Sequence, residues 1–115
     1  MKFIAQNDLK ITLKEKRKTH RVFIKDISYI QSSSYLSSVH FIDGRKPIIV
    51  AKLLKYFEEE LGIYGFLRIC RNTLFNKRNV QLLYTDNTRK ILMDGGAKLT
   101  ISCRKYSKIN QILKN

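Results

Sequence analysis

Two stretches of the chain combine basic side chains with polar groups and contain no acidic residue. Residues 66–78 carry four Lys or Arg side chains, and residues 102–108 carry three. Lysine and arginine bind phosphate groups, and arginine and asparagine side chains can also form hydrogen bonds with the edges of bases. The chemistry of these two segments therefore predicts binding to double-stranded DNA.

The side chains that enzymes use for catalysis occur in patterns that do not favour catalysis. The two histidines, His20 and His40, are isolated in the sequence, so no serine or cysteine has an evident base beside it. The only acidic run, residues 58–60, is expected to lie on the solvated face of a helix. Residues 94–96 are expected to form a tight hairpin that opens a strand rather than a helix, unlike a phosphate-binding loop. We predict that the protein is not an enzyme.

The chain also lacks a pattern for a metal or a cofactor, and we expect neither. Cys70 and Cys103 have no partner at the short spacing that zinc sites use. The sequence contains no signal peptide and no apolar run of membrane-spanning length. We therefore expect a cytoplasmic protein with reduced cysteines and no membrane partner.

The positive charge is concentrated at the two ends of the sequence. The formal net charge is +14, from 23 Lys and Arg against 9 Asp and Glu. Residues 1–25 carry a net charge of +6, residues 26–66 of −1 and residues 67–115 of +9. Such a charge points to a polyanionic partner. The middle of the chain is therefore predicted to be scaffold, and the ends contact surface.

Periodicity predicts a mainly β fold that must position these segments. We expect several small antiparallel sheets with two short α-helices, in a single domain over residues 1–115. The segment 72–76 is expected to be a turn or a single helical turn, and the helices are expected over residues 51–61 and after Ser102. The strands are expected over residues 10–14, 21–25, 27–30, 35–42, 46–50, 67–69, 80–85, 90–93 and 98–101.

The familiar DNA-binding signatures are missing. The sequence has no zinc-finger spacing, no leucine heptad and no close pair of helices for a helix-turn-helix. Recognition must then come from loops, from strand ends or from the start of the last helix. Two alternatives remain open. An RNA-binding module could stack bases on Tyr35, Phe41 and Tyr84, and a basic protein-interaction domain could carry the charge incidentally.

Four motifs together resemble the LytTR DNA-binding domain, in its order and spacing over roughly residues 10–113. They are Ile27-Ser-Tyr-Ile-Gln-Ser-Ser33, Leu53-Leu-Lys-Tyr-Phe57, Leu67-Arg-Ile-Cys-Arg-Asn-Thr-Leu-Phe-Asn76 and Ile101-Ser-Cys-Arg-Lys-Tyr106. The resemblance implies a bacterial transcription regulator, such as a response regulator of a two-component system. It also implies loops and short turns that enter successive major grooves and bend the DNA. The chain would be either a fragment of such a regulator or a small complete one.

The resemblance assigns roles to individual residues. The central pattern of the family is close to F-R-I-H-R-S-x-L-V-N, and its base-reading position falls on Arg71. Cys70 and Asn72 replace the His and Ser of the pattern, and Cys103 is inserted between Ser102 and Arg104. The expected DNA-binding residues are Ser34, Ser37, Arg71, Asn72, Asn76, Lys77, Arg78, Arg104, Lys105 and Lys108.

Several of these residues have a second possible role. Asn76 can instead cap the turn before Val80, and Lys77 and Arg78 can contact phosphate or only solvent. Arg68 can contact DNA or pair with an acid of the scaffold. With no heptad, we expect a monomer in the free state and two copies on direct-repeat DNA sites.

Overall fold

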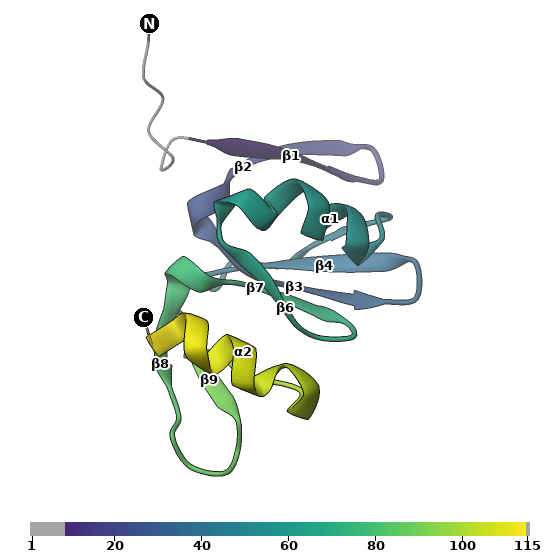
Figure 1. Cartoon of the computed structure of the whole chain (residues 1–115). Coiled ribbons are helices and arrows are strands. Elements are labelled where there is room, and N and C mark those ends of the chain that lie inside the picture. Colours follow the sequence, from purple (N-terminus) through teal and green to yellow (C-terminus); the bar gives the residue numbers. More distant parts are fainter. Residues whose placement is uncertain (1–8, 115) are drawn as a thin grey trace, which may run out of the picture.

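A five-stranded antiparallel sheet forms the middle layer of the protein, in a computed structural model that describes residues 9–114 (Figure 1). The strand order is β5-β4-β3-β7-β6. The bounds are β3 Ile27–Ser33, β4 Leu36–Phe41, β5 Ile48–Val50, β6 Phe66–Cys70 and β7 Thr73–Asn76. Strand β5, which follows Pro47, is an outer strand of this sheet, the position in which a sheet tolerates proline.

Two smaller sheets lie on opposite faces of this layer. One pairs β1 with β2, and the other has the order β10-β9-β8. Their bounds are β1 Lys10–Glu15, β2 Lys18–Phe23, β8 Val80–Leu83, β9 Lys90–Met93 and β10 Lys98–Thr100. The predicted fold class, mainly β with small antiparallel sheets and two helices, is confirmed.

Two α-helices and three short 3-10 helices complete the described chain. Helix α1 covers the β1–β2 side, and α2 covers the side of the third sheet (Figure 1). The bounds are α1 Leu54–Leu61, α2 Cys103–Lys114, η2 Ile24–Asp26, η3 Gly62–Tyr64 and η4 Lys77–Asn79. The expected helix over residues 51–61 was too long at its start. Leu53 has extended backbone angles and is 43% exposed, so it precedes the helix and lies outside its buried face.

Alternating side chains of the central strands divide the core into two clusters. Leu74 of β7 packs with Phe57 of α1, whereas the next residue, Phe75, packs with Met93 of β9 and Ile109 of α2. This alternation is the two-residue period of a strand that is buried on both faces. Residues 73–76 therefore form a central strand, and the expected turn over residues 72–76 is wrong. The strand was not predicted because only three residues, Thr73 to Phe75, separate two asparagines, which are typical of turns.

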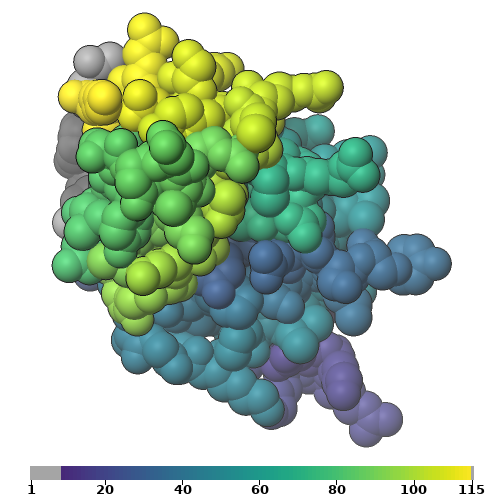
Figure 2. All heavy atoms as spheres, turned by 90° about the horizontal axis from the view of Figure 1, so that it is seen from below, coloured from purple at the N-terminus to yellow at the C-terminus, as the bar shows by residue number. Residues whose placement is uncertain are grey.

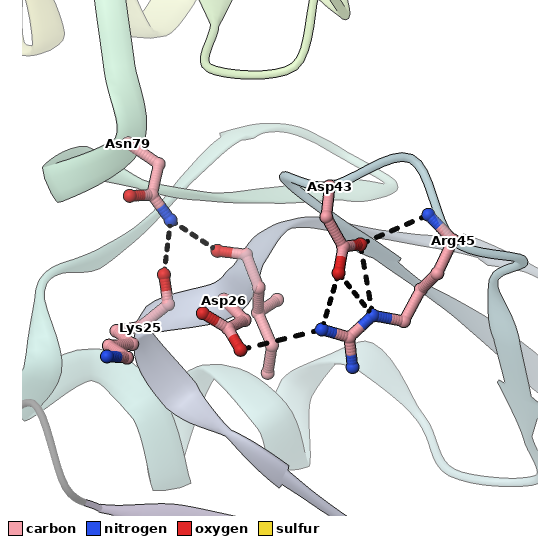
Figure 3. Close-up of polar contacts among 6 residues, drawn as sticks. Lys25, Asp26, Asp43, Arg45 and Asn79 are labelled. Atoms are coloured by element: carbon pink, nitrogen blue, oxygen red, sulfur yellow. Dashed lines mark hydrogen bonds and ion pairs between the residues drawn. The ribbon is translucent and has the colours of Figure 1, made fainter.

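Polar contacts hold the end of the sheet at which β3 begins and β4 ends (Figure 3). Asn79 donates from Nδ2 to the carbonyl oxygens of Lys25, at 2.8 Å, and of Ile27, at 2.9 Å. Arg45 Nη2 lies 2.7 Å from Asp43 Oδ2 and 3.5 Å from Asp26 Oδ2. The hydrogen bonds from Arg45 hold the pKa of Asp43 below its usual value.

The turn between β9 and β10 packs closely against this same end. Gly95 has φ +97°, and a Cβ atom there would lie 2.5 Å from the carbonyl oxygen of Ile42. Asp94 N also donates to Asn79 O at 2.7 Å. The hairpin expected at residues 94–96 is therefore present, and it fastens the third sheet to the central one.

Candidate nucleic-acid interface

Three segments that are far apart in sequence meet along one side of the protein. They are the β3–β4 turn, the β6–β7 turn and the start of α2, and we call residues 34–35, 71–72 and 102–105 the contact edge. Ser32 N donates to Asn72 O at 2.8 Å, and Ser102 N donates to Ile69 O at 2.9 Å. These backbone bonds fix the β6–β7 turn between the other two segments. The contact edge contains no Asp or Glu.

A shallow depression joins the β6–β7 turn to the start of α2. Its walls come from both basic segments: Arg68, Cys70, Arg71, Ser102, Arg104 and Lys105. Residues 68–71 of the first acid-free stretch and residues 102–105 of the second thus form one basic surface. An elongated polyanion could contact both at once.

Arg68 positions the turn that presents Arg71. Its Nη1 donates to the carbonyl oxygen of Arg71 at 2.7 Å, and its Nε donates to Glu58 Oε1 of α1 at 3.0 Å. Of its two possible roles, the pairing with an acid of the scaffold is therefore the one present. Arg71 itself is exposed, and its side chain projects from a turn whose backbone is anchored.

Asn72 uses one end of its amide within the turn and leaves the other available. Its Oδ1 accepts from Cys70 Sγ and from Thr73 Oγ1, each at 3.1 Å. Within residues 9–114 its Nδ2 has no hydrogen-bond partner. An exposed amide donor of this kind can bond to a phosphate or a base acceptor.

The start of α2 presents basic side chains at a helix N-terminus. Arg104 and Lys108 are exposed and Lys105 is half-buried, with no acid in the first turn. Unpaired backbone N–H groups and the helix dipole favour an anion at this position. Arg89 holds the helix start, because its Nη1 donates to Ile101 O at 3.1 Å and lies 2.7 Å from Cys103 Sγ.

Two residues expected to contact DNA are buried instead. Ser37 is 0% exposed, and its Oγ donates to Lys52 O at 2.6 Å. Asn76 is 1% exposed; its Nδ2 donates to Ile27 O at 3.0 Å and its Oδ1 accepts from Arg78 N at 3.1 Å. Both side chains are fully occupied within the fold, so their assignment as contact residues is corrected. The second role considered for Asn76, capping the turn before Val80, is confirmed.

Lys77 and Arg78 do not join Arg71, although they are close to it in sequence. Strand β7 separates them, since Cys70 pairs with Thr73 at the turn and Phe66 pairs with Asn76 at the open end of the hairpin. Lys77 and Arg78 are both exposed in η4, at that open end. The basic segment 66–78 is thus split between two ends of the sheet.

The β3–β4 turn presents Ser34 and two large exposed side chains beside it. Ser34, which was expected at the interface, is exposed and adopts φ +58°. The side chains that project beside it are Tyr35, 77% exposed, and Leu36, 47% exposed. Tyr35 was expected within the strand over residues 35–42, whereas it lies in the turn before β4. The strand before the turn is also longer than the expected residues 27–30, because β3 continues to Ser33.

The acidic run over residues 58–60 is mostly paired with basic side chains of the scaffold. Two of the three acids in the run 58–60 form ion pairs, Glu58 with Arg68 and Glu60 with Lys52, each at 3.0 Å. The expectation of a merely solvated acidic face is therefore only partly right. Glu58, which lies beside Arg104 and Lys105, is thus neutralised by Arg68, and the charges of Arg71, Arg104 and Lys105 remain available to a partner.

The side chains considered for catalysis, base stacking or metal binding are either buried in the fold or apart from one another. The His40 ring stacks on Tyr29 with centroids 4.3 Å apart, and burial lowers the pKa of His40. Phe41 is buried, Tyr84 lies outside the strands and Tyr35 lies in a turn, so these rings do not form a stacking platform. Within residues 9–114, no three His, Cys, Asp or Glu side chains gather around a possible metal site. That part of the chain also has no helix suited by length and apolarity to span a membrane.

A family model and a solved structure both match the chain. The family model of the LytTr DNA-binding domain matches residues 17–114. A solved structure described as the LytTr DNA-binding domain of a putative methyl-accepting/DNA response regulator from Bacillus cereus superposes with a TM-score of 0.73 at 20% identity. The match covers 92% of this chain and 96% of that one, and shows a shared fold. No curated protein matches the chain.

Proposed function

Because the chain belongs to the LytTr DNA-binding domain family, we propose that it binds double-stranded DNA in a sequence-specific manner and regulates transcription. The observation that carries this proposal is the contact edge. Backbone hydrogen bonds bring the β6–β7 turn and the start of α2 to one side of the protein, where Arg71 and Arg104 are exposed. A site that reads sequence needs such fixed, exposed donors beside groups that bind phosphate.

Each segment of the contact edge takes a different part in the proposal. Arg71 reads a base, since a guanidinium can bond to guanine O6 and N7 together. Arg104 and Lys105 bind phosphate or a neighbouring base from the helix start, and Asn72 donates from its free amide. Tyr35 and Leu36 supply apolar contacts, for example to a thymine methyl group. Entry of these turns into successive major grooves, with bending of the DNA, follows from the resemblance noted in the sequence.

Residues outside the contact edge receive lesser roles. Lys108 is one turn beyond Arg104 on α2 and contacts phosphate. Lys77 and Arg78 lie at the far end of the β6–β7 hairpin, and we assign them no base contact. Two copies of the chain, monomeric when free, occupy direct repeats in this proposal; selection of bound duplexes from a random library measures the spacing of the repeats.

Binding to DNA should weaken steeply as salt increases. If each copy contacts five to seven phosphates, log K against log salt should have a slope of about −4.5 to −6. The measurement is a titration of a random-sequence duplex, followed by fluorescence anisotropy at several concentrations of potassium chloride. A slope near zero would contradict binding to any nucleic acid and would favour the protein-interaction alternative.

A further inference from the structure

We propose that the β1–β2 hairpin is a second phosphate-binding surface, which contacts the backbone of the same duplex beside the contact edge. This inference rests on the proposed function and extends it to a part of the chain with no assigned role. Strand β1, Lys10–Glu15, lies outside the residues that the family model matches, which begin at residue 17.

The outer face of the hairpin carries positive charge only. The pairs Ile11–Val22, Leu13–His20 and Glu15–Lys18 alternate along the hairpin with the pairs Lys10–Phe23, Thr12–Arg21 and Lys14–Thr19. Ile11, Leu13 and Val22 are buried, so the first set faces the core and the second set faces solvent. The solvent-facing set contains Lys10, Lys14 and Arg21 and no acid.

The only acid of the hairpin is turned toward the scaffold. Glu15 Oε2 accepts from Ile49 N at 3.0 Å, and its Oε1 lies 3.3 Å from His20 Nε2. The hydrogen bond from Ile49 lowers the pKa of Glu15. Glu15 is therefore engaged by the sheet and by His20, and of the tip cations it interacts with Lys18, its cross-strand partner. Within residues 9–114, Lys14, Lys16 and Arg17 form no ion pair.

The tip of the hairpin lies at the same end of the central sheet as the β3–β4 turn. Lys14 and Lys16 line a hollow with Ala51 and Lys52, and Lys52 O accepts from Ser37 Oγ. Ser37 follows the turn at Ser34 by three residues, so the tip and the turn are neighbours across β5 and β4.

The pictures agree with this placement. In Figure 1 the β1–β2 turn points to the same side as the β3–β4 turn. Figure 2 shows, along that side, the yellow-green start of α2, the teal-green β6–β7 turn, the blue β3–β4 turn and the purple hairpin tip in succession. The hairpin thus continues the row of segments that forms the contact edge.

DNA phosphate is the partner that this surface fits best. Cations on both sides of the uncharged β3–β4 turn, at Arg71 and the start of α2 and at the hairpin tip, can follow the regularly spaced charges of a duplex without reading its bases. Because the hairpin lies beyond the β3–β4 turn in this row, its contacts should fall on backbone that flanks the base-reading part of the site.

A pair of matched double variants tests the inference. Lys14→Gln with Arg17→Gln removes two charges at the hairpin tip, where both side chains are exposed. The control, Lys46→Gln with Lys114→Gln, removes two exposed charges outside the contact edge and the hairpin, in the β4–β5 connection and in the last turn of α2. Each protein is titrated with a duplex that the wild type has selected, extended by about one helical turn on each side.

The hairpin variant should bind the extended duplex about three- to twentyfold more weakly than the wild type, with a salt slope smaller in magnitude by about two. Its preference for selected over random DNA should be unchanged, because phosphate contacts carry no sequence information. The control should match the wild type, and all three proteins should melt at the same temperature. If the hairpin variant and the control bind with equal affinity and equal salt slope, the inference about the hairpin is wrong. As long as the wild type binds DNA, that outcome leaves the proposed function intact. Failure of the wild type to bind DNA would instead remove the proposed function itself.

Discussion

Replacing Arg71 by alanine should lower the affinity for a selected duplex by about 5- to 150-fold, equivalent to about 1–3 kcal/mol. The affinity for random DNA should change much less, because a base contact adds little where the matching base is missing. Preference should relax at one or two base pairs. The measurement is the ratio of dissociation constants for selected and random duplexes at one salt concentration.

The structure gives this prediction a matched control. Lys77 is exposed, like Arg71, and belongs to the same stretch of sequence, but it lies at the opposite end of the β6–β7 hairpin. Lys77→Ala should leave the ratio of specific to random affinity unchanged. Neither substitution should shift the melting temperature. If Arg71→Ala weakens both duplexes by the same factor, Arg71 binds phosphate, and base reading must be sought at Arg104 or in the β3–β4 turn.

Gly95→Ala should destabilise the fold by roughly 2–4 kcal/mol. Two causes add at this position: the backbone has φ +97°, and the new Cβ would lie 2.5 Å from Ile42 O. The carbonyl oxygen of Ile42 and the new Cβ atom are both fixed to the backbone, so the clash can be relieved only if the β9–β10 turn moves away from the central sheet. Thermal unfolding followed by circular dichroism should show a melting temperature lower by roughly 10–25 °C.

Gly96→Ala separates the two causes. Gly96 has φ +101°, but a Cβ atom added there would have no heavy atom within 4 Å other than those of its chain neighbours. Backbone strain alone should then cost about 1–2 kcal/mol. Equal destabilisation by the two substitutions would show that the clash of the new Cβ atom with Ile42 O adds nothing to the cost of backbone strain at Gly95.

Much of the fold was accessible from the sequence because its signals are local. Alternating apolar residues predicted most strands, and Asp94-Gly95-Gly96 predicted a hairpin that the structure contains. The segment 73–76 was missed for a physical reason. A strand that is buried on both faces shows no alternation of apolar and polar residues in its sequence, and this strand is only four residues long. The error carried a consequence for function, since it made Lys77 and Arg78 look like neighbours of Arg71.

The candidate site was only partly predictable, because its composition depends on tertiary contacts. The basic segments were identified from charge, but the meeting of the β6–β7 turn with α2 depends on the bond between Ser102 N and Ile69 O. Ser37 and Asn76 are buried and so are not available to DNA. A sequence motif locates such residues but does not show whether their side chains are exposed. The positioning role of Arg68 likewise needed Glu58 of α1 beside it, ten residues earlier.

The most direct test of sequence-specific DNA binding is selection from a random duplex library by the wild-type chain. Repeated rounds of capture and sequencing should enrich a short motif present twice in the same orientation, with centres separated by about one helical turn or a multiple of it. Light scattering of the complex with that duplex should find two copies of the chain. Enrichment of no motif, with all sequences retained equally at every round, would contradict sequence-specific binding and leave only a basic surface that binds any polyanion.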